Sequence, residues 1–158
     1  MSEKVMEPVL RPMEEKDISQ VTELEKFCFS DAWSEKLVAD LLTSSFDESW
    51  VLENLEGEII GYINLRFLAG EGELMRIAVK PAFRGCGYSK KLMDRMMISA
   101  KEQQAFDLTL EVRAGNEPAI KLYQSYGFVS EAVRKGYYHN PTEDAWIMWL
   151  HGLPSIPS

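Results

Sequence analysis

Two glycines between a strand pattern and a helix pattern indicate where this sequence could bind a ligand. Gly85 and Gly87 follow an apolar stretch that Pro81 ends, and a helical pattern begins near Ser89. Glycines at such a junction allow consecutive backbone N–H groups to point toward one place, which forms an anion site at the positive end of the helix dipole. The sequence therefore predicts a phosphate-binding loop, although a Gly-x-Gly turn alone also occurs in many connections that bind nothing.

Two lysines directly after this loop support the prediction of an anion site. Lys90 and Lys91 fall in the first turn of the predicted helix. The helix dipole disfavours a positive charge at that end by roughly 0.3–1 kcal/mol for each residue. An anion bound at the loop would offset this unfavourable energy.

A carboxylate and a phenol later in the chain have the chemistry needed to move protons. Strand alternation over residues 108–113 puts Glu111 on the polar face, together with Thr109 and Arg113. Tyr123 lies on the helix that follows. Glu111 could accept the proton of an attacking amine, and Tyr123 could give a proton to a leaving group. The alternatives are a carboxylate on a solvated face and an aromatic residue of the core.

The cysteines and histidines argue against several other classes of chemistry. Cys28 and Cys86 are far apart, with no CxxC pair, and the chain holds only 2 histidines. The sequence therefore predicts reduced thiols, with neither a disulfide framework nor a metal site. No Cys-His or Ser-His signature of covalent catalysis is recognisable, which favours direct attack of an acceptor on a donor.

The elements that must position these residues alternate between strand and helix patterns. We expect strands over residues 9–13, 50–55, 59–68, 73–79, 108–112, 128–138 and 144–150. We expect helices over residues 17–27, 34–44, 89–100 and 116–126, with Asp17 and Ser34 as N-caps of the first two. One mixed α/β domain over residues 1–150 follows, with a loosely ordered Pro- and Ser-rich tail over residues 151–158.

Two stretches of the sequence resemble motifs of one enzyme family. Arg84, Gly87 and Ser89 stand at the positions of the acetyl-CoA motif Arg/Gln-x-x-Gly-x-Gly/Ala of the Gcn5-related N-acetyltransferases (GNAT), with Ser89 as a departure. Residues 110–128 are similar to the pattern LEVRxxNxxAIxLYxxxGF of the ribosomal-protein-alanine N-acetyltransferases, the RimI group. The resemblance to that group extends over residues 33–148, hence over most of the chain.

The resemblance implies a fold, a cosubstrate and catalytic roles. The implied fold is a mostly antiparallel seven-stranded sheet that splays between its fourth and fifth strands, with four helices on its faces. The implied cosubstrate is acetyl-CoA, with Val79 N–H polarising the thioester carbonyl. Glu111 corresponds to the general base and Tyr123 to the general acid. The residues implied to contact CoA are Ile77, Ala78, Val79, Arg84, Gly85, Cys86, Gly87, Tyr88, Ser89, Lys90 and Asn116.

The RimI group also implies an acceptor, the N-terminal alanine of the eighteenth small-subunit ribosomal protein. Trp33, Tyr137 and Tyr138 match the group's pattern near its peptide groove. An α-amine with a pKa of about 7.7–8.0 is also easier to deprotonate than a lysine amine near 10.4. Alternatives stay open, because Trp33 and Tyr138 could be packing residues. The whole chain could also acetylate small amines such as polyamines or aminoglycosides, or be a noncatalytic acyl-CoA-binding module.

Charge and hydropathy limit the partners of the chain. A net charge of −8 disfavours direct nucleic-acid binding and makes a basic peptide easier to accommodate, although acidity often serves only solubility. The sequence contains no stretch of about 18 apolar residues that could span a bilayer. Residues 1–8 lack the apolar region of a secretion signal. We therefore expect a cytoplasmic protein, monomeric or weakly dimeric.

Overall fold

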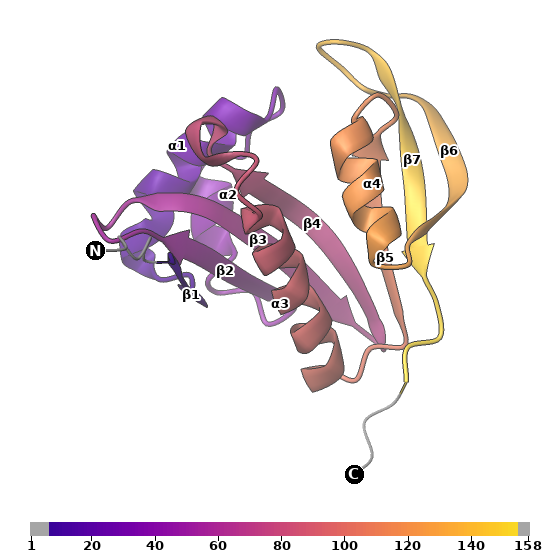
Figure 1. Cartoon of the computed structure of the whole chain (residues 1–158), viewed down its shortest axis with the longest axis horizontal. Coiled ribbons are helices and arrows are strands. Elements are labelled where there is room, and N and C mark those ends of the chain that lie inside the picture. The colour runs from indigo at the N-terminus through magenta and orange to yellow at the C-terminus, as the bar shows by residue number, and fades with distance from the viewer. Residues whose placement is uncertain (1–6, 155–158) are drawn as a thin grey trace, which may run out of the picture. The chain divides into compact units, whose positions relative to one another are not determined.

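The computed structural model describes residues 7–154 of the 158-residue chain, so the predicted features at residues 1–6 and 155–158 lie outside the described residues. The strands are β1 (Val9–Pro12), β2 (Asp47–Glu53), β3 (Ile59–Leu68), β4 (Glu71–Val79), β5 (Asp107–Arg113), β6 (Val129–Tyr138) and β7 (Glu143–Leu150). The α-helices are α1 (Ile18–Cys28), α2 (Glu35–Asp40), α3 (Tyr88–Glu102) and α4 (Glu117–Ser125), and short 3₁₀ turns span Glu15–Asp17 (η1) and Pro81–Phe83 (η2) (Figure 1).

The strands of residues 7–154 form one sheet in the order β1-β2-β3-β4-β5-β7-β6. β1 pairs antiparallel with β2, and β7 pairs antiparallel with both β5 and β6. β4 and β5 run parallel, with Glu71 opposite Asp107 and Leu74 opposite Leu110. The predicted mixed α/β fold, with its mostly antiparallel seven-stranded sheet and four helices, is confirmed. The splay expected beyond these β4–β5 pairs stays a prediction.

The chain divides into two compact units, Met1–Asn64 with Arg76–Leu92 and Leu65–Met75 with Met93–Ser158. In the first unit, α1 and α2 cover one face of the sheet, and their apolar side chains form a core with those of β2 and β3 (Figure 1). Val21 and Leu24 are buried as the helical spacing predicts, but Phe27 is 66% exposed, so the apolar stripe ends before it.

The second predicted helix is shorter than expected. Ser34 is its N-cap, as predicted, and its hydroxyl accepts a hydrogen bond from Leu37 N–H. The α-helix ends at Asp40, not near residue 44. The backbone N–H groups of Leu41, Leu42 and Thr43 donate to the carbonyls three residues before them, as in a 3₁₀ turn, and not four residues before them.

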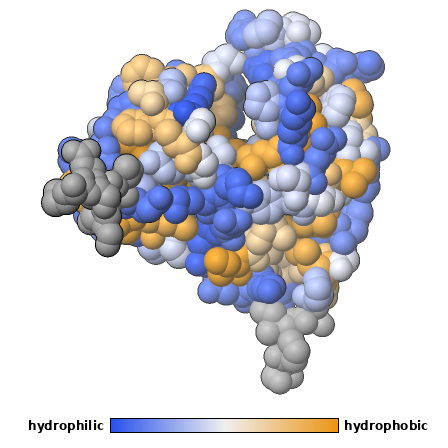
Figure 2. All heavy atoms as spheres, in the orientation of Figure 1, coloured by the Kyte–Doolittle hydropathy of each residue, from blue (hydrophilic) through white to orange (hydrophobic). Residues whose placement is uncertain are grey.

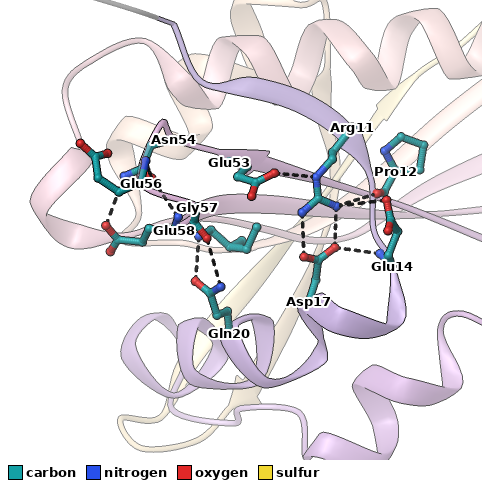
Figure 3. Close-up of polar contacts among 11 residues, drawn as sticks. Arg11, Pro12, Glu14, Asp17, Gln20, Glu53, Asn54, Glu56, Gly57 and Glu58 are labelled. Carbon is teal, nitrogen blue, oxygen red and sulfur yellow. Dashed lines mark hydrogen bonds and ion pairs between the residues drawn. The ribbon is translucent and has the colours of Figure 1, made fainter.

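Asp17 is at the N-cap position of α1, as predicted, but its carboxylate makes no capping hydrogen bond to this helix because it is used elsewhere (Figure 3). Its two oxygens accept hydrogen bonds from Arg11 at 2.7 and 2.8 Å, and Arg11 Nε also donates to Glu53 at 2.8 Å. Burial opposes ionisation of Asp17, but the hydrogen bonds from Arg11 and from Glu14 N–H outweigh it and lower the pKa of the Asp17 carboxyl. Arg11 therefore ties β1 to the start of α1 and to β2.

In the second unit, β5, β7 and β6 form an antiparallel sheet, and α4 lies against it (Figure 1). Leu108, Leu110, Ile120, Phe128 and Met148 are buried there.

α3 is amphipathic: its apolar side chains at positions 92, 93, 96 and 100 are buried, whereas its outward surface is mainly hydrophilic (Figure 2). The predicted helical period of this segment is thus confirmed.

The described part of the predicted loose tail is hydrogen bonded to the second unit. His151 Nδ1 lies 3.2 Å from the Asp107 carboxylate, which also accepts a bond from Gly152 N–H at 3.1 Å. Leu153 N–H donates to the Phe106 carbonyl at 2.7 Å. The domain boundary at residue 150 stays a prediction. Within residues 7–154, no helix combines the length and apolarity that a membrane crossing requires.

Candidate active site

The predicted phosphate loop lies in the first unit, between η2 and α3. Gly85 and Gly87 have φ angles of 80° and 82°, in the left-handed region that glycine adopts without strain. Arg84, Cys86 and both glycines are exposed, so the loop backbone is accessible to a ligand. Ser89 already belongs to the first turn of α3, where it is half-buried. The local geometry is that of a turn whose N–H groups precede a helix N-terminus.

The first turn of α3 has no acidic residue of its own. Lys91 Nζ instead lies 2.9 Å from the carboxylate of Glu7, in the segment before β1. One of the two helix-start lysines is thus compensated by a side chain of the protein, and the argument for an external anion rests on the loop N–H groups.

The side chain of Arg84 is directed toward the end of β4. Its Nε donates to the Val79 carbonyl at 3.1 Å, and its Nη2 lies 3.5 Å from Cys28 Sγ. Cys28 Sγ in turn lies 3.7 Å from the same carbonyl. Burial raises the pKa of the Cys28 thiol, so Cys28 is protonated and unsuited to act as a nucleophile. These contacts orient the Val79–Lys80 peptide, next to the N–H predicted to polarise a thioester.

In the second unit, Glu111 lies on β5 among side chains that hold its carboxylate in place. Its side chain is 24% exposed and lies 3.8 Å from Arg134 of β6. The Tyr137 hydroxyl is hydrogen bonded to the same carboxylate, and this bond is the main reason that the pKa of Tyr137 is raised. Glu111 is accessible and oriented, as a general base must be.

A second carboxylate, Glu73 of β4, was missed from the sequence. Glu73 is opposite Thr109 in the parallel register, so it shares a sheet face with Glu111. Burial, and secondly the charge of Glu111, raise the pKa of Glu73. Thr109, which was predicted on the same polar face, is buried, and its hydroxyl donates to the Met148 carbonyl at 2.9 Å.

Tyr123 is 5% exposed on α4, and its ring meets Phe128 edge to face at 6.3 Å between centroids. Burial is the main cause that raises the pKa of Tyr123, with a smaller contribution from Tyr138. The rings of Tyr137 and Tyr138 are also edge to face, 5.1 Å apart. In the second unit, the Glu111 carboxylate is therefore hydrogen bonded to the Tyr137 hydroxyl, and the Tyr137 ring contacts the Tyr138 ring. Tyr138 in turn contributes to the raised pKa of Tyr123.

Asn116 opens α4, as predicted, and its side-chain oxygen accepts a hydrogen bond from Ala119 N–H at 3.3 Å. This cap uses only the oxygen of the amide. A contact between the amide N–H₂ group and CoA stays a prediction.

Trp33, in the first unit, is positioned by two residues that the sequence did not single out. Its backbone N–H donates to the buried carboxylate of Glu25 at 2.8 Å. The guanidinium carbon of Arg76 lies 4.5 Å from the Trp33 ring centroid. An acidic residue on a helix and a basic residue on a strand give no signal of such a pairing until the fold brings them together.

The fold, the glycine loop of the first unit and the group of Glu111 with Tyr123, Tyr137 and Tyr138 in the second unit point to one class of protein. Residues 18–128 match the Acetyltransferase (GNAT) family, and the chain belongs to this family. It is therefore an acyl-transferring enzyme, an N-acetyltransferase by family.

Similar proteins narrow the group within the family. The ribosomal protein bS18-alanine N-acetyltransferase of Haemophilus ducreyi is 34% identical over 141 residues, which cover 87% of this chain and 95% of that protein. The crystal structure of the ribosomal-protein-S18-alanine N-acetyltransferase of Escherichia coli superimposes with a TM-score of 0.84 at 28% identity, and covers 95% of this chain and 96% of that chain. Arabidopsis thaliana NAA60, solved in complex with acetyl-CoA, shares the fold at 16% identity with a TM-score of 0.79, over 90% of this chain and 97% of that chain.

Proposed function

We propose that this enzyme transfers the acetyl group of acetyl-CoA to the α-amine of a protein N-terminal alanine, and that its acceptor is ribosomal protein bS18. The observation that carries this proposal is the similarity to the Haemophilus ducreyi enzyme over nearly the full length of both chains. The acetyltransferase domain would comprise residues 1–150.

The charge around the phosphate loop supports acetyl-CoA as the donor. Every charged residue from Ile77 to Lys91 is basic, namely Lys80, Arg84, Lys90 and Lys91, although Lys80 pairs with Glu58 and Lys91 with Glu7. CoA carries phosphates, which the glycine-rich turn and the helix N-terminus can bind through backbone N–H groups. The complex of NAA60 with acetyl-CoA shows that a protein of this fold accommodates the molecule.

Acidic residues near Trp33 support a basic acceptor peptide. Asp31 and Glu35 lie two positions from Trp33 on either side, and both are exposed. A basic peptide following the modified alanine would be attracted to such a surface. Tyr137 and Tyr138 are the further candidates for contact with the peptide, and Tyr137 is 44% exposed.

The residues supply each step of a direct transfer. Glu111 takes the proton of the α-ammonium, directly or through one water, and the neutral nitrogen attacks the thioester carbon. Val79 N–H stabilises the negative charge that develops on the carbonyl oxygen. The carbon–sulfur bond then breaks, Tyr123 gives its proton to the departing thiolate, and the nitrogen loses its second proton, which returns the Tyr123 phenolate to the phenol. The raised pKa of Tyr123 keeps the phenol protonated for this role at neutral pH.

Free CoA release measured with three acceptors tests the proposal. The acceptors are a basic peptide with a free N-terminal alanine, the same peptide blocked at its N-terminus, and spermidine. We expect release with the free peptide alone. Release with the blocked peptide or with spermidine, and none with the free N-terminus, would replace the proposed acceptor class by a lysine or a polyamine.

Replacing Gly87 by Ala should weaken acetyl-CoA binding about tenfold, because a side chain at φ 82° strains the loop by roughly 1–2 kcal/mol. A Cβ there would meet nothing within 4 Å, so strain and not collision is responsible. Calorimetric titration with acetyl-CoA measures the effect. Gly152→Ala is the matched control, with φ 69° and equally open surroundings outside the loop. Equal affinities in the two variants would argue against the loop as the binding site.

A further inference from the structure

A buried ion pair in the first unit, formed by Glu25 and Arg76, makes several contacts with the short segment between α1 and α2. Glu25 of α1 has no exposed surface, and the Arg76 side chain of β4 is only 11% exposed. Arg76 Nη2 lies 3.3 Å from Glu25 Oε1. The Tyr62 hydroxyl donates to the other oxygen of Glu25, and burial, followed by the Glu25 charge, raises the pKa of this tyrosine. Glu25 therefore has fixed partners on both of its oxygens.

Both members of the pair bind the segment Phe29–Trp33, which connects α1 to α2. The guanidinium carbon of Arg76 lies 4.1 Å from the Phe29 ring centroid and 4.5 Å from that of Trp33. Arg76 Nη2 also donates to the Asp31 carbonyl at 2.8 Å. Glu25 Oε1, the oxygen nearest Arg76, accepts a hydrogen bond from Trp33 N–H at 2.8 Å. The ion pair thus fixes the backbone of the segment at two points and two of its aromatic rings.

Stability alone does not explain this arrangement. A buried ion pair costs desolvation energy that its attraction often only just repays, so apolar side chains of similar volume would serve a core as well. Arg76 Nε is buried without a hydrogen-bond partner within residues 7–154, which adds to the cost. What apolar side chains could not reproduce is the set of directional contacts to Asp31 and Trp33.

Arg76 also directly precedes Ile77, Ala78 and Val79 on β4, the residues proposed to hold the thioester. Its backbone belongs to the strand of the donor, and its side chain holds the segment that contains Trp33. We propose that Arg76 is a positioning residue that, with Glu25, fixes the Phe29–Trp33 segment and so presents Trp33 to the acceptor peptide at a set place beside the donor strand. This inference rests on the proposed function, because it assigns Trp33 to peptide binding.

Arg76→Lys tests the inference, since lysine keeps the charge but lacks the planar group that stacks on two rings and donates in two directions. The KM for the Ala-initiated basic peptide should rise about tenfold, while kcat changes by less than about threefold and the acetyl-CoA Kd by less than about twofold. Arg11→Lys is the matched control. Arg11 is also largely buried and paired with carboxylates in the same unit, but none of its contacts reaches Phe29–Trp33.

A double-mutant cycle separates positioning from a general loss of stability. If Arg76 acts through Trp33, Arg76→Lys should leave the peptide KM nearly unchanged when Trp33 is already Phe. Independent effects of the two substitutions on the peptide KM would overturn the inference. So would an equal rise of the KM in Arg11→Lys.

A readout without substrate distinguishes this inference from the proposed function. The chain has 4 tryptophans, so the fluorine NMR signal of Trp33 in 5-fluorotryptophan-labelled protein is identified by its loss in Trp33→Phe. Arg76→Lys should shift or broaden that signal, and Arg11→Lys should leave it in place.

An unchanged signal in Arg76→Lys overturns the inference, whatever the acceptor. A shifted signal with an unchanged peptide KM in an active enzyme also overturns it. An enzyme that is inactive on the peptide contradicts the proposed acceptor, and the NMR signal still decides whether Arg76 positions Trp33.

Discussion

Replacing Glu111 by Gln should lower kcat for the Ala-initiated peptide by about 100-fold, the lower end of what a positioned general base contributes. Glutamine has nearly the same shape and can still accept a hydrogen bond from Tyr137, but it cannot take the proton of the α-ammonium. The residual rate should rise up to a pH of about 8, because the acceptor amine, with a pKa of about 7.7–8.0, then loses its proton to solvent. Steady-state CoA release between pH 6 and 9 measures both effects.

Glu73→Gln is the control for this substitution. Glu73 shares a sheet face with Glu111, and burial and the Glu111 charge raise the pKa of its carboxyl, so it is the other carboxylate that could act as a base. We expect its replacement to change kcat by less than about threefold, since Tyr137 and Arg134 contact Glu111. Acetyl-CoA affinity should be unchanged in both variants. A large loss in Glu73→Gln with little loss in Glu111→Gln would transfer the role of base to Glu73.

The elements were predictable where one local rule decided them. Period-2 and period-3.6 patterns located the strands and helices, and Ser34 and Asn116 marked helix starts by their capping chemistry. The glycine turn before α3 was predicted from its two glycines, and Gly85 and Gly87 there have positive φ angles, which glycine adopts without strain. These features depend on neighbours within a few positions, which a single sequence contains.

The features that failed or were missed depend on contacts between distant elements. Asp17 was expected to cap a helix, but Arg11 competes for its carboxylate once β1 lies beside α1. The pairing of Arg76 with Glu25 joins β4 to α1, and no local pattern announces it. Glu73 lies on the same face as Glu111 only because β4 and β5 adopt one particular register. Long-range register, and not secondary structure, limits what the sequence tells about this candidate site.

Replacing Tyr123 by Phe should lower kcat by about tenfold, less than the loss expected for Glu111→Gln. The magnitude follows from the leaving group: a thiol with a pKa of about 8.5 is already a moderate leaving group as the thiolate, so a proton from a phenol helps less than it would an alkoxide. Phenylalanine keeps the edge-to-face contact with Phe128, so the fold of α4 should be retained. Acetyl-CoA titration and the melting temperature check that only the chemical step has changed.

Tyr126→Phe is the matched control, because it removes one phenolic hydroxyl at the end of the same helix. That hydroxyl donates to Asp94 at 2.6 Å, so its loss should lower the melting temperature and leave kcat unchanged.

The pH profile of the wild-type rate adds a second check on Tyr123. Because burial raises the pKa of Tyr123, the phenol should stay protonated up to at least pH 10, and the wild-type rate should show no alkaline decline from this group below that value. A decline with its midpoint at or below about pH 10 that Tyr123→Phe abolishes would mean that the phenol ionises with an ordinary or lowered pKa, and that its burial in α4 does not set its protonation during catalysis.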